Sequence, residues 1–534
     1  MSTIPDQIDV VVIGTGLTNS IVAAACSRIG KSVLHLDKNN YYGDNWASFT
    51  FQQLVDWIRV MDPLNPSLES IPEELINKSR MFCIDLAPRF LYSNGSMVDL
   101  LVKSNVARYH EFKNNIRILC MISEHNEDGT LANEQIHVMP CRRNEVFTSP
   151  LLSNLADKRR LMKFIESCMH YKESKSQNKG TGDCLDQTSS DSAEQEELHS
   201  DKPISKYLEE KGLKSNLNEF IVNSIAMVEP TETVNEACKK IKRFMIATER
   251  YGRSPFLFPL YGCGEFPQSF CRLSAVFGGI YCLNTNIDEV VINSSSSKQE
   301  CDSKTTSRST EQPSANNFDV KFSNGEHQVK CDLLVIDQKN AIELKLTKPP
   351  PINEHLSRAI VITTKRIVQS ENNEDFVSLL RIPPSEGKSA NVVYLLEFNS
   401  SALVCPKDLN IVYLWTKAST AKPEEDLREI VDRIFKSANC SDCIAWKFFF
   451  QQPIADPTEV FRNTRLNKDN SLHASSPLCD DFDYDANIKE AEQIFHRMYP
   501  DQEFLPRAPD PDEIISITCE SLDASEAPLQ EQQQ

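Results

Sequence analysis

The stretch from Asp9 to Ser20, DVVVIGTGLTNS, constrains the fold of this chain more than any other. An apolar strand runs directly into a glycine turn and a helix, and a second strand, SVLHLD, ends at Asp37. This order is typical of the βαβ unit that holds the pyrophosphate of a dinucleotide. The sequence therefore predicts an α/β fold.

The cofactor-binding positions of this unit are incomplete. Gly14 and Gly16 occupy the first two glycine positions, and Asp37 stands where an acid would bind ribose. The third position is Asn19, whose side chain would project where the helix and strand must approach closely. Bulky aromatic residues follow in NNYYG, where a flavin site is usually small and glycine-rich. We therefore expect no bound FAD, NAD or other cofactor.

Composition narrows the possible partners and the cellular setting. A net charge of −19 argues against nucleic acid and suits basic partners or solubility. The first residues do not resemble a signal peptide, so we interpret the 17 cysteines as reduced thiols of a cytosolic protein. Cys440 and Cys443 have CxxC spacing without a second ligand pair nearby, so no metal site is predicted.

Two polar stretches and the C-terminus interrupt the folded sequence. Residues 172–202 and 294–317 have almost no large apolar side chains and cannot offset the entropy of ordering. We expect both to be disordered insertions, and the tail 516–534 to be disordered as well.

The chain of 534 residues is long enough for two or more domains. Residues 101–250 have mostly helical periodicity, whereas short strands dominate from Phe318 onward. The sequence thus predicts an α/β domain formed by residues 1–100 and 251–515, with an all-helical domain of residues 101–250 inserted into it.

Two long blocks identify a family. DVVVIGTGLTNSIVAAACSRIGKSVLHLDKNNYYG and SPFLFPLYGCGEFPQSFCRLSAVFGGIYCLN resemble the signature motifs of the Rab GDP-dissociation inhibitor and Rab escort protein superfamily. The resemblance implies a flavoprotein-like fold that binds no flavin. NWASFTFQQLVDWI, FCIDLAPRFLYSNGSMVDLLVKSNVARYHEFKN and EFLPRAPDPDEI resemble the escort branch of this superfamily.

The escort branch implies a function without catalysis. Its members bind unprenylated, GDP-bound Rab GTPases and present them to the α/β heterodimer of Rab geranylgeranyltransferase. They then carry the geranylgeranylated Rab to membranes. No Ser-His-Asp or Cys-His spacing suggests a catalytic site in this chain. Two alternatives remain open: a Rab GDP-dissociation inhibitor that recycles prenylated Rabs, and an FAD-dependent oxidoreductase.

The resemblance also assigns a Rab-binding platform. The matching positions are Tyr42, Lys78, Arg80, Glu265 and Arg272. The residue types suit an interface, because Tyr gives a broad contact while Arg and Glu form charge-assisted hydrogen bonds. The alternative is that Glu265 and Arg272 form an ion pair within their own domain. Cys282 stands where the inhibitors carry a methionine that contacts the GTPase.

Two further sites are expected on the helical domain. Phe244 matches the position at which the escort branch docks on the transferase α subunit, but ordinary core packing is the alternative because Ile241 and Met245 share its stripe. A groove for the geranylgeranyl chain is expected between helices, although a helix buried on two sides would show the same pattern. The groove candidates are Met162, Ile165, Met169, Ile221 and Ile225.

Overall fold

The structure is a computed structural model of the chain. It describes residues 4–125, 131–149, 154–171, 198–213, 216–248, 250–293, 317–323, 328–347, 355–369, 376–384, 391–438, 440–455, 471–480 and 482–507. Most of the two predicted insertions (172–197 and 294–316) and the predicted tail lie outside the described residues.

The first sheet is assembled from distant parts of the chain. Its order is β10-β2-β1-β13-β12-β11, and β19 pairs with β13. Pairing is parallel from β10 to β13 and at β19, and antiparallel across β11, β12 and β13. The strands are β1 (Gln7–Ile13), β2 (Val33–Leu36), β10 (Ile280–Cys282), β11 (Ile287–Ile292), β12 (Phe318–Phe322), β13 (Gln328–Asp337) and β19 (Leu472–Ser475).

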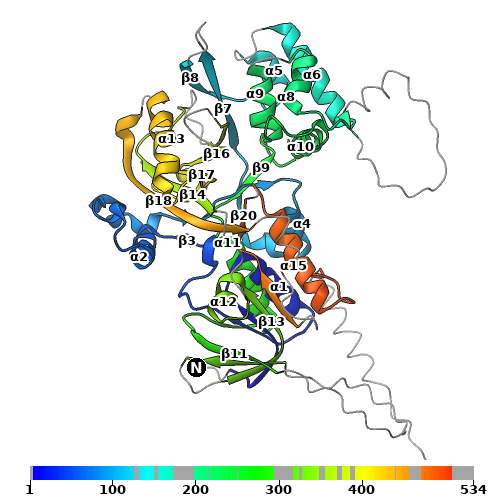
Figure 1. Cartoon of the computed structure of the whole chain (residues 1–534), viewed down its shortest axis with the longest axis vertical. Coiled ribbons are helices and arrows are strands. Elements are labelled where there is room, and N and C mark those ends of the chain that lie inside the picture. The colour runs from blue at the N-terminus through cyan, green and yellow to red at the C-terminus, as the bar shows by residue number, and fades with distance from the viewer. Residues whose placement is uncertain are drawn as a thin grey trace, which may run out of the picture.

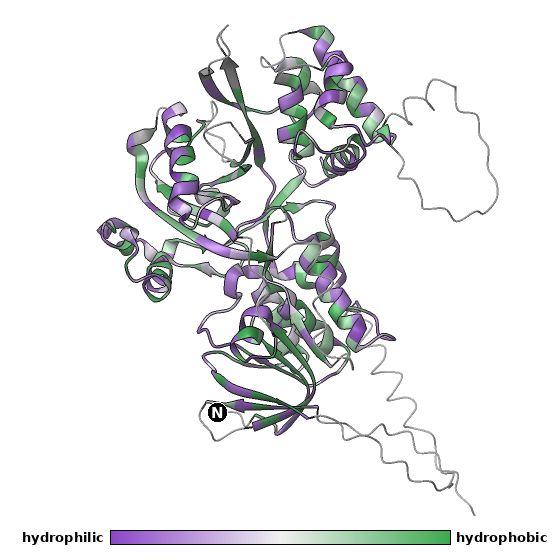
Figure 2. Ribbon diagram, in the orientation of Figure 1, coloured by the Kyte–Doolittle hydropathy of each residue, from purple (hydrophilic) through white to green (hydrophobic). Residues whose placement is uncertain are grey.

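Helices cover this first sheet, which occupies the lower part of Figure 1. The central strand β1 is apolar at consecutive positions because both of its faces are buried. Helix α1 (Leu17–Arg28) packs against α11 (Glu265–Val276) and α15 (Asp485–Met498), and α12 (Gln338–Glu343) follows β13. The central strands are therefore hydrophobic throughout, and the outer helices carry their polar residues toward solvent (Figure 2).

A second sheet lies above the first, in the upper left of Figure 1. Its order is β20-β18-β14-β17-β16-β15-β7-β8, and α13 (Pro423–Ser437) packs against β14, β17 and β18. The strands are β7 (Ile116–His125), β8 (Leu131–Val138), β14 (His355–Thr363), β15 (Val377–Ile382), β16 (Val393–Phe398), β17 (Asn410–Lys417), β18 (Ile444–Ala455) and β20 (Leu478–Cys479).

The predicted all-helical domain of residues 101–250 is wrong for its first part. β7 pairs in parallel with β15 and antiparallel with β8, so residues 116–125 and 131–138 extend the second sheet. Ile116, Ile118 and Cys120 are buried on a strand whose neighbour lies some 260 residues later in the sequence. A hairpin whose partner is so distant gives only a weak local signal between two helical stretches.

The helical elements that remain form a separate bundle, in the upper right of Figure 1. Helices α6 and α10 pack against each other, and α10 packs against a π-helix, Phe220–Ala226. The helices are α5 (Arg143–Thr148), α6 (Leu155–Met169), α8 (Ile204–Glu210), α9 (Asn216–Glu219) and α10 (Val234–Ala247).

Short elements connect these layers. Helices α2 (Phe51–Met61), α3 (Glu73–Asn77) and α4 (Ser96–Lys103) follow the second strand of the βαβ unit. Small ladders join β3 (Ser48–Phe49) to β4 (Ile84–Asp85), and β5 (Leu91–Tyr92) and β6 (Phe112–Lys113) to β9 (Phe256–Pro259). Among the described residues, no helix is long and apolar enough to cross a membrane.

One pair of cysteines differs from the prediction of reduced thiols. Cys440 and Cys443 form a disulfide. Their three-residue separation in the turn before β18 brings the two Cα atoms to 5.4 Å, a distance that a disulfide can span. Within the described part of the chain, no group of three or more His, Cys, Asp or Glu side chains could hold a metal ion.

Candidate functional site

Two carboxylates of the chain itself, Asp337 and Asp37, contact the glycine loop after β1. A Cβ atom built on Gly14 would lie 2.0 Å from Asp337 Oδ2. Asp37 accepts hydrogen bonds from Thr15 N at 2.8 Å, Thr15 Oγ1 at 2.6 Å and Asn39 N at 2.8 Å. The Asp337 carboxylate thus packs against the tight turn at Gly14, whereas a Cβ atom on Gly16, the position at which a pyrophosphate would approach, would meet nothing within 4 Å. The Asp37 carboxylate, which would bind a ribose, is already engaged by Thr15 and Asn39.

The side chain of Asn19 also forms hydrogen bonds with this loop. Its side chain is fully buried, and Nδ2 donates to the carbonyl oxygens of Ile13 at 2.9 Å and Gly14 at 3.2 Å. The amide therefore ties the start of α1 to the end of β1, where a third glycine would have allowed close packing. Asn19 thus joins the helix to the strand by hydrogen bonds at the position where the fingerprint has a glycine.

Helix α11 presents an exposed polar stripe. Glu265, Gln268 and Arg272 follow one another at three- and four-residue intervals, with Gln268 and Arg272 exposed and Glu265 half-buried. Burial raises the pKa of the Glu265 carboxyl. The Arg272 guanidinium carbon lies 4.5 Å from the centre of the Tyr109 ring, a cation–π contact.

The alternative of an ion pair between Glu265 and Arg272 does not hold in this geometry. Seven helical residues separate their Cα atoms by about 10 Å along the helix axis. Neither side chain forms an ion pair with any residue that the structure describes. Both charges therefore remain available to a partner.

A buried carboxylate fixes the loop that precedes α11. Asp85 Oδ1 accepts hydrogen bonds from Cys263 N at 2.9 Å and from the Ser48 hydroxyl. Ser48 Oγ in turn accepts from Gly264 N at 2.8 Å. A Cβ atom on Gly264 would lie 2.5 Å from Ser48 Oγ, so the close approach requires glycine. This network sets the position at which α11 begins, and hence that of Glu265.

Asp85 makes the stability of this loop dependent on pH. Burial raises the pKa of Asp85 from its ordinary value of 3.8 to about 7. Because the folded pKa lies above the unfolded one, its contribution is complete below about pH 4 and disappears as the pH rises toward 7. Between pH 5 and pH 8, the wild type should lose about 2–3 kcal/mol of unfolding free energy through this group.

Asp85→Asn should abolish this part of the pH dependence, because an amide does not titrate in that range. The measurement is the unfolding free energy from urea denaturation at pH 5 and pH 8 for both proteins. Asp337 and Glu490, whose pKa values are also raised to about 7, remain in both proteins and cancel in the difference. Parallel pH profiles for the two proteins would contradict the assignment.

Lys78 and Arg80 differ in their availability, although both were predicted on the platform. Lys78 Nζ contacts Asp408 Oδ2 at 2.5 Å and Glu74 Oε1 at 2.7 Å, and these hydrogen bonds raise the pKa of Lys78. Arg80 is exposed and has no hydrogen bond or ion pair with another described residue. Arg80 is therefore the free cation of this pair.

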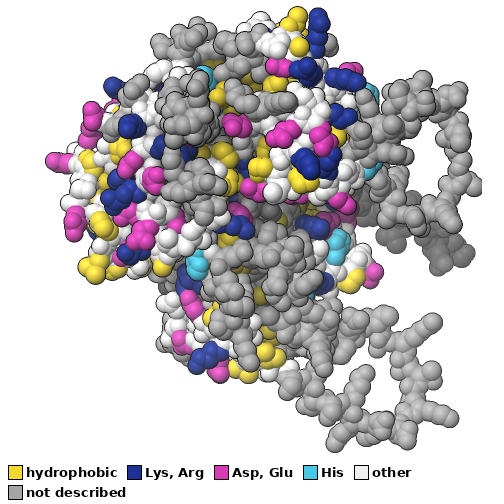
Figure 3. Space-filling view, turned by 45° about the horizontal axis from the view of Figure 1, so that its top comes forward, with side chains coloured by type: hydrophobic (Ala, Val, Ile, Leu, Met, Phe, Trp, Pro, Cys, Tyr) yellow, Lys and Arg dark blue, Asp and Glu magenta, His cyan; other side chains and the backbone are white. Residues whose placement is uncertain are grey.

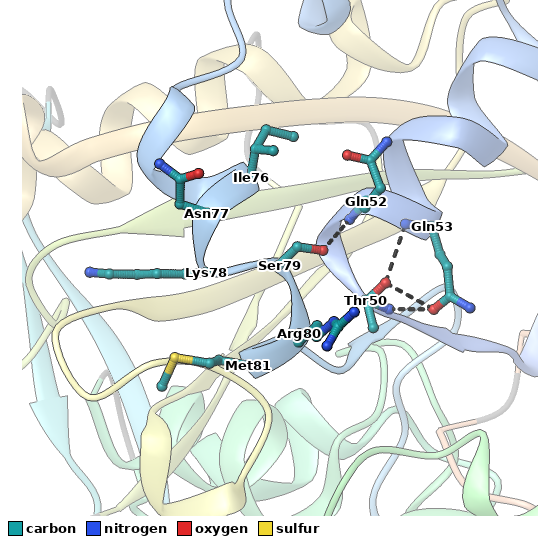
Figure 4. Close-up of a pocket in the computed structure, with 9 residues that line it drawn as sticks. All are labelled: Thr50, Gln52, Gln53, Ile76, Asn77, Lys78, Ser79, Arg80 and Met81. Atoms are coloured by element: carbon teal, nitrogen blue, oxygen red, sulfur yellow. Dashed lines mark hydrogen bonds between the residues drawn. The ribbon is translucent and has the colours of Figure 1, made fainter.

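The two cations border a hollow of about 510 Å³. Figure 4 shows Arg80 beside Thr50, with the Lys78 side chain extending away from α2. Gln53 accepts hydrogen bonds from Thr50 N and Thr50 Oγ1 and so caps α2. The hollow is lined by Thr50, Gln52, Gln53, Ile76, Asn77, Lys78, Ser79, Arg80 and Met81.

Tyr42 and Cys282 both lie at the edge strand β10 of the first sheet. Tyr42 is half-buried, and its ring centre lies 6.2 Å from that of Tyr281 on β10. Cys282 ends the same strand, is half-buried, and its carbonyl accepts from Asp37 N at 3.0 Å. Both side chains are therefore partly exposed to solvent at this edge of the first sheet.

The candidate groove residues divide into two kinds. Ile165, Ile221 and Ile225 are buried within the hydrophobic core, whereas Met162 and Met169 on α6 are half-buried. Ile221 and Ile225 belong to the π-helix, a rare element that often occurs at functional sites. In this conformation the three isoleucines are packing residues, and their place in a lipid groove stays a prediction.

Phe244 packs in the core in this conformation, as the alternative of core packing predicts, and its contact with a transferase stays a prediction. Phe244 is only 1 % exposed, and its ring lies edge-on to Phe256 at a centroid distance of 6.1 Å. The inner face of α10 carries Phe244 into the core together with Ile241 and Ala247. A side chain buried to this degree offers no contact surface to another protein.

Comparison with known proteins decides the family. A model of the GDP dissociation inhibitor family matches residues 4–498. The chain belongs to this family. Three relatives carry the name Rab proteins geranylgeranyltransferase component A: one from Drosophila melanogaster (34% identical; 96% of this chain and 93% of the relative covered), component A 1 from Caenorhabditis elegans (31%; 98% and 99%) and component A 1 from Homo sapiens (26%; 98% and 96%).

Solved structures show the same fold for this family member. RAB GDI from Plasmodium falciparum superposes with a TM-score of 0.67 at 21% identity, covering 93% of this chain and 99% of that structure. An oxidoreductase from Methanosarcina mazei gives a TM-score of 0.51 at 10% identity, covering 92% and 100%. The predicted α/β, flavoprotein-like fold is therefore confirmed.

Sequence reasoning missed the residues that position the loop before α11 and the Arg272 side chain. Asp85 and Ser48 act through single hydrogen bonds to the loop before α11 and follow no periodic pattern. Tyr109, which stacks on Arg272, lies more than 160 residues from it in the chain. The glycines in YGCGE were the available signal, because two closely spaced glycines indicate a tight backbone approach.

Proposed function

We propose that this chain is an accessory protein of Rab geranylgeranylation. It binds unprenylated, GDP-bound Rab GTPases and presents them to the α/β heterodimer of Rab geranylgeranyltransferase. It accommodates the geranylgeranyl chain on its helical part and delivers the modified Rab from the cytosol to a membrane. It performs no catalysis of its own.

The observation that carries this proposal is that relatives named component A align with nearly the whole chain. The alignment with the Drosophila melanogaster relative covers 96% of this chain. The free charges of Glu265, Arg272 and Arg80 support a protein-binding role for the platform. Figure 3 shows acidic and basic side chains interspersed on one face of the molecule, with no extended basic field for nucleic acid.

The FAD-dependent oxidoreductase is not favoured, because the Asp37 carboxylate, which would bind a ribose, is engaged by Thr15 and Asn39, and the third glycine of the fingerprint is replaced by Asn19. A recycling inhibitor uses the same fold, as the likeness to RAB GDI illustrates. Binding to an unprenylated Rab together with support of prenylation separates the escort role from that of an inhibitor.

Arg272→Ala should weaken binding to a GDP-loaded, unprenylated Rab by about ten- to a hundredfold. The reason is that loss of a charge-assisted interfacial hydrogen bond costs roughly 1.5–3 kcal/mol. Affinity is measured by isothermal titration calorimetry, and the melting temperature of the variant should stay unchanged because Arg272 is exposed.

Arg428→Ala is the matched control. Arg428 is an exposed arginine on α13, paired with Glu424 on the surface of the second sheet. Its removal should leave Rab affinity within about twofold, as expected for a surface ion pair away from the interface. If the wild type and Arg272→Ala bind Rab with equal affinity, the assignment of Arg272 to the Rab-binding platform is contradicted.

A further inference from the structure

Three remote segments meet beside Glu265. Cys83 N donates to Val404 O at 2.9 Å, and Cys83 Sγ donates to Tyr261 O at 2.7 Å. Tyr261 N donates to Ala402 O at 3.3 Å. Glu265 N donates to Gly262 O at 3.4 Å, which places the start of α11 close to this junction.

Large apolar side chains project into solvent from this junction. Met81 is 57 % exposed, Tyr261 52 % and Leu403 43 %. Exposed apolar residues are ordinary when they are scattered singly over a surface. Here three of them come from segments that backbone hydrogen bonds hold together. We call Met81, Tyr261 and Leu403 the Tyr261 surface.

Two of the three occupy backbone positions that favour glycine. Tyr261 has φ +67° and is the third residue of a turn closed by a hydrogen bond from Gly262 N to Pro259 O at 3.3 Å. Glycine or asparagine is usual at such a position. Leu403 has φ +57° directly after the short helix Ser400–Ala402, where glycine is again the usual residue.

The surrounding network maintains this strain. Gly262, next to Tyr261, has φ +93°, and a Cβ atom there would lie 2.5 Å from Asp85 Oδ1. The turn is therefore pressed against the buried carboxylate that also positions α11. Large side chains kept in a strained conformation by their surroundings are typical of binding sites.

Charged residues border the Tyr261 surface. Glu265 lies near Cys83, and Arg80 precedes Met81 in the chain. Lys78 and Asp408 form an ion pair on the same two segments, residues 78–83 and 402–408. An apolar centre with a charged rim is the usual anatomy of a protein interface, in which a few central apolar or aromatic residues give most of the affinity.

We propose that the Tyr261 surface is the apolar centre of the GTPase-binding platform and receives apolar and aromatic side chains of the small GTPase. The inference rests on the proposed function and extends it, because it identifies residues that supply affinity beyond the charges of Arg80, Glu265 and Arg272. The Tyr261 surface adjoins the proposed charged platform, because Arg80 precedes Met81 in the chain and Glu265 N donates to Gly262 O, next to Tyr261, at 3.4 Å.

The test uses substitutions that relieve strain while they remove the contact. In Tyr261→Gly and Leu403→Gly, glycine adopts positive φ without steric cost, which offsets the greater entropy that glycine gives the unfolded chain, so both variants should melt close to the wild type. Tyr261→Gly should nevertheless weaken binding to a GDP-loaded, unprenylated Rab at least tenfold, as expected for an aromatic hot spot. Leu403→Gly should weaken it by a smaller factor.

The control is Ile292→Ala, which removes a side chain that is 50 % exposed on the edge strand β11 of the first sheet. It should bind Rab like the wild type. If Tyr261→Gly and Leu403→Gly bind with wild-type affinity while Arg272→Ala does not, the Tyr261 surface is refuted and the proposed function stands. If the wild-type protein does not bind GDP-loaded Rab, both are refuted.

Discussion

Phe244→Ala is expected to lower the free energy of unfolding by about 3–5 kcal/mol, because it leaves a cavity in a well-packed core. Phe244 is 1 % exposed and contacts Phe256 at the junction between α10 and β9. The neighbouring residues belong to rigid elements that cannot collapse fully into the space. Urea denaturation of the variant and the wild type measures the difference.

Ile246→Ala is the control on the same helix. Ile246 lies two residues further along α10 and is 50 % exposed, so its truncation should cost less than about 1 kcal/mol. A Phe244→Ala protein as stable as the Ile246→Ala protein would show that Phe244 does not support the core. That result would favour the role of Phe244 in docking on the transferase.

Gly14→Ala should destabilise the protein by about 2–4 kcal/mol. Gly14 has φ +93°, and an L-residue in such a conformation is strained by roughly 1–2 kcal/mol. The new methyl group would also displace the Asp337 carboxylate, which caps α12 through Asn340 N at 2.9 Å, and loss of a cap costs about 1 kcal/mol.

Gly16→Ala is the paired control, because a Cβ atom there meets nothing within 4 Å and its φ of −59° suits any residue. Its cost should stay below about 1 kcal/mol, the effect expected at an N-cap. Urea denaturation compares the two variants. If they were equally stable, Gly14 would not be required for the approach of Asp337.

The first sheet could be predicted because its central strands carry their signal locally. The apolar run of β1, the glycine turn and Asp37 lie within 30 residues of one another, and the antiparallel pair β12 and β13 has the alternation of a hairpin. β7 could not be assigned in the same way, because its burial depends on β15, far along the chain. Only the tertiary partner distinguishes this strand from the helical sequence around it.

The candidate platform residues could be named from the sequence where a motif carried them, and their role stays a prediction. Glu265 and Arg272 were identified from one block of sequence, and the helical period places both on one side of α11. The difference between Lys78 and Arg80 depends on Asp408, more than 300 residues away, and could not be inferred from spacing. Tyr261 and Leu403 could be recognised only from the backbone conformation, because tyrosine and leucine are not residue types that indicate positive φ.

The most direct test of the escort role is geranylgeranyl transfer to an unmodified, GDP-loaded Rab by the purified Rab geranylgeranyltransferase heterodimer. Labelled lipid incorporated into the Rab is measured with and without this chain. The proposal predicts transfer that requires the chain and that falls for Arg272→Ala when the chain is limiting. Transfer that proceeds equally well without the chain, or that the chain fails to support although it binds the Rab, would contradict the escort role.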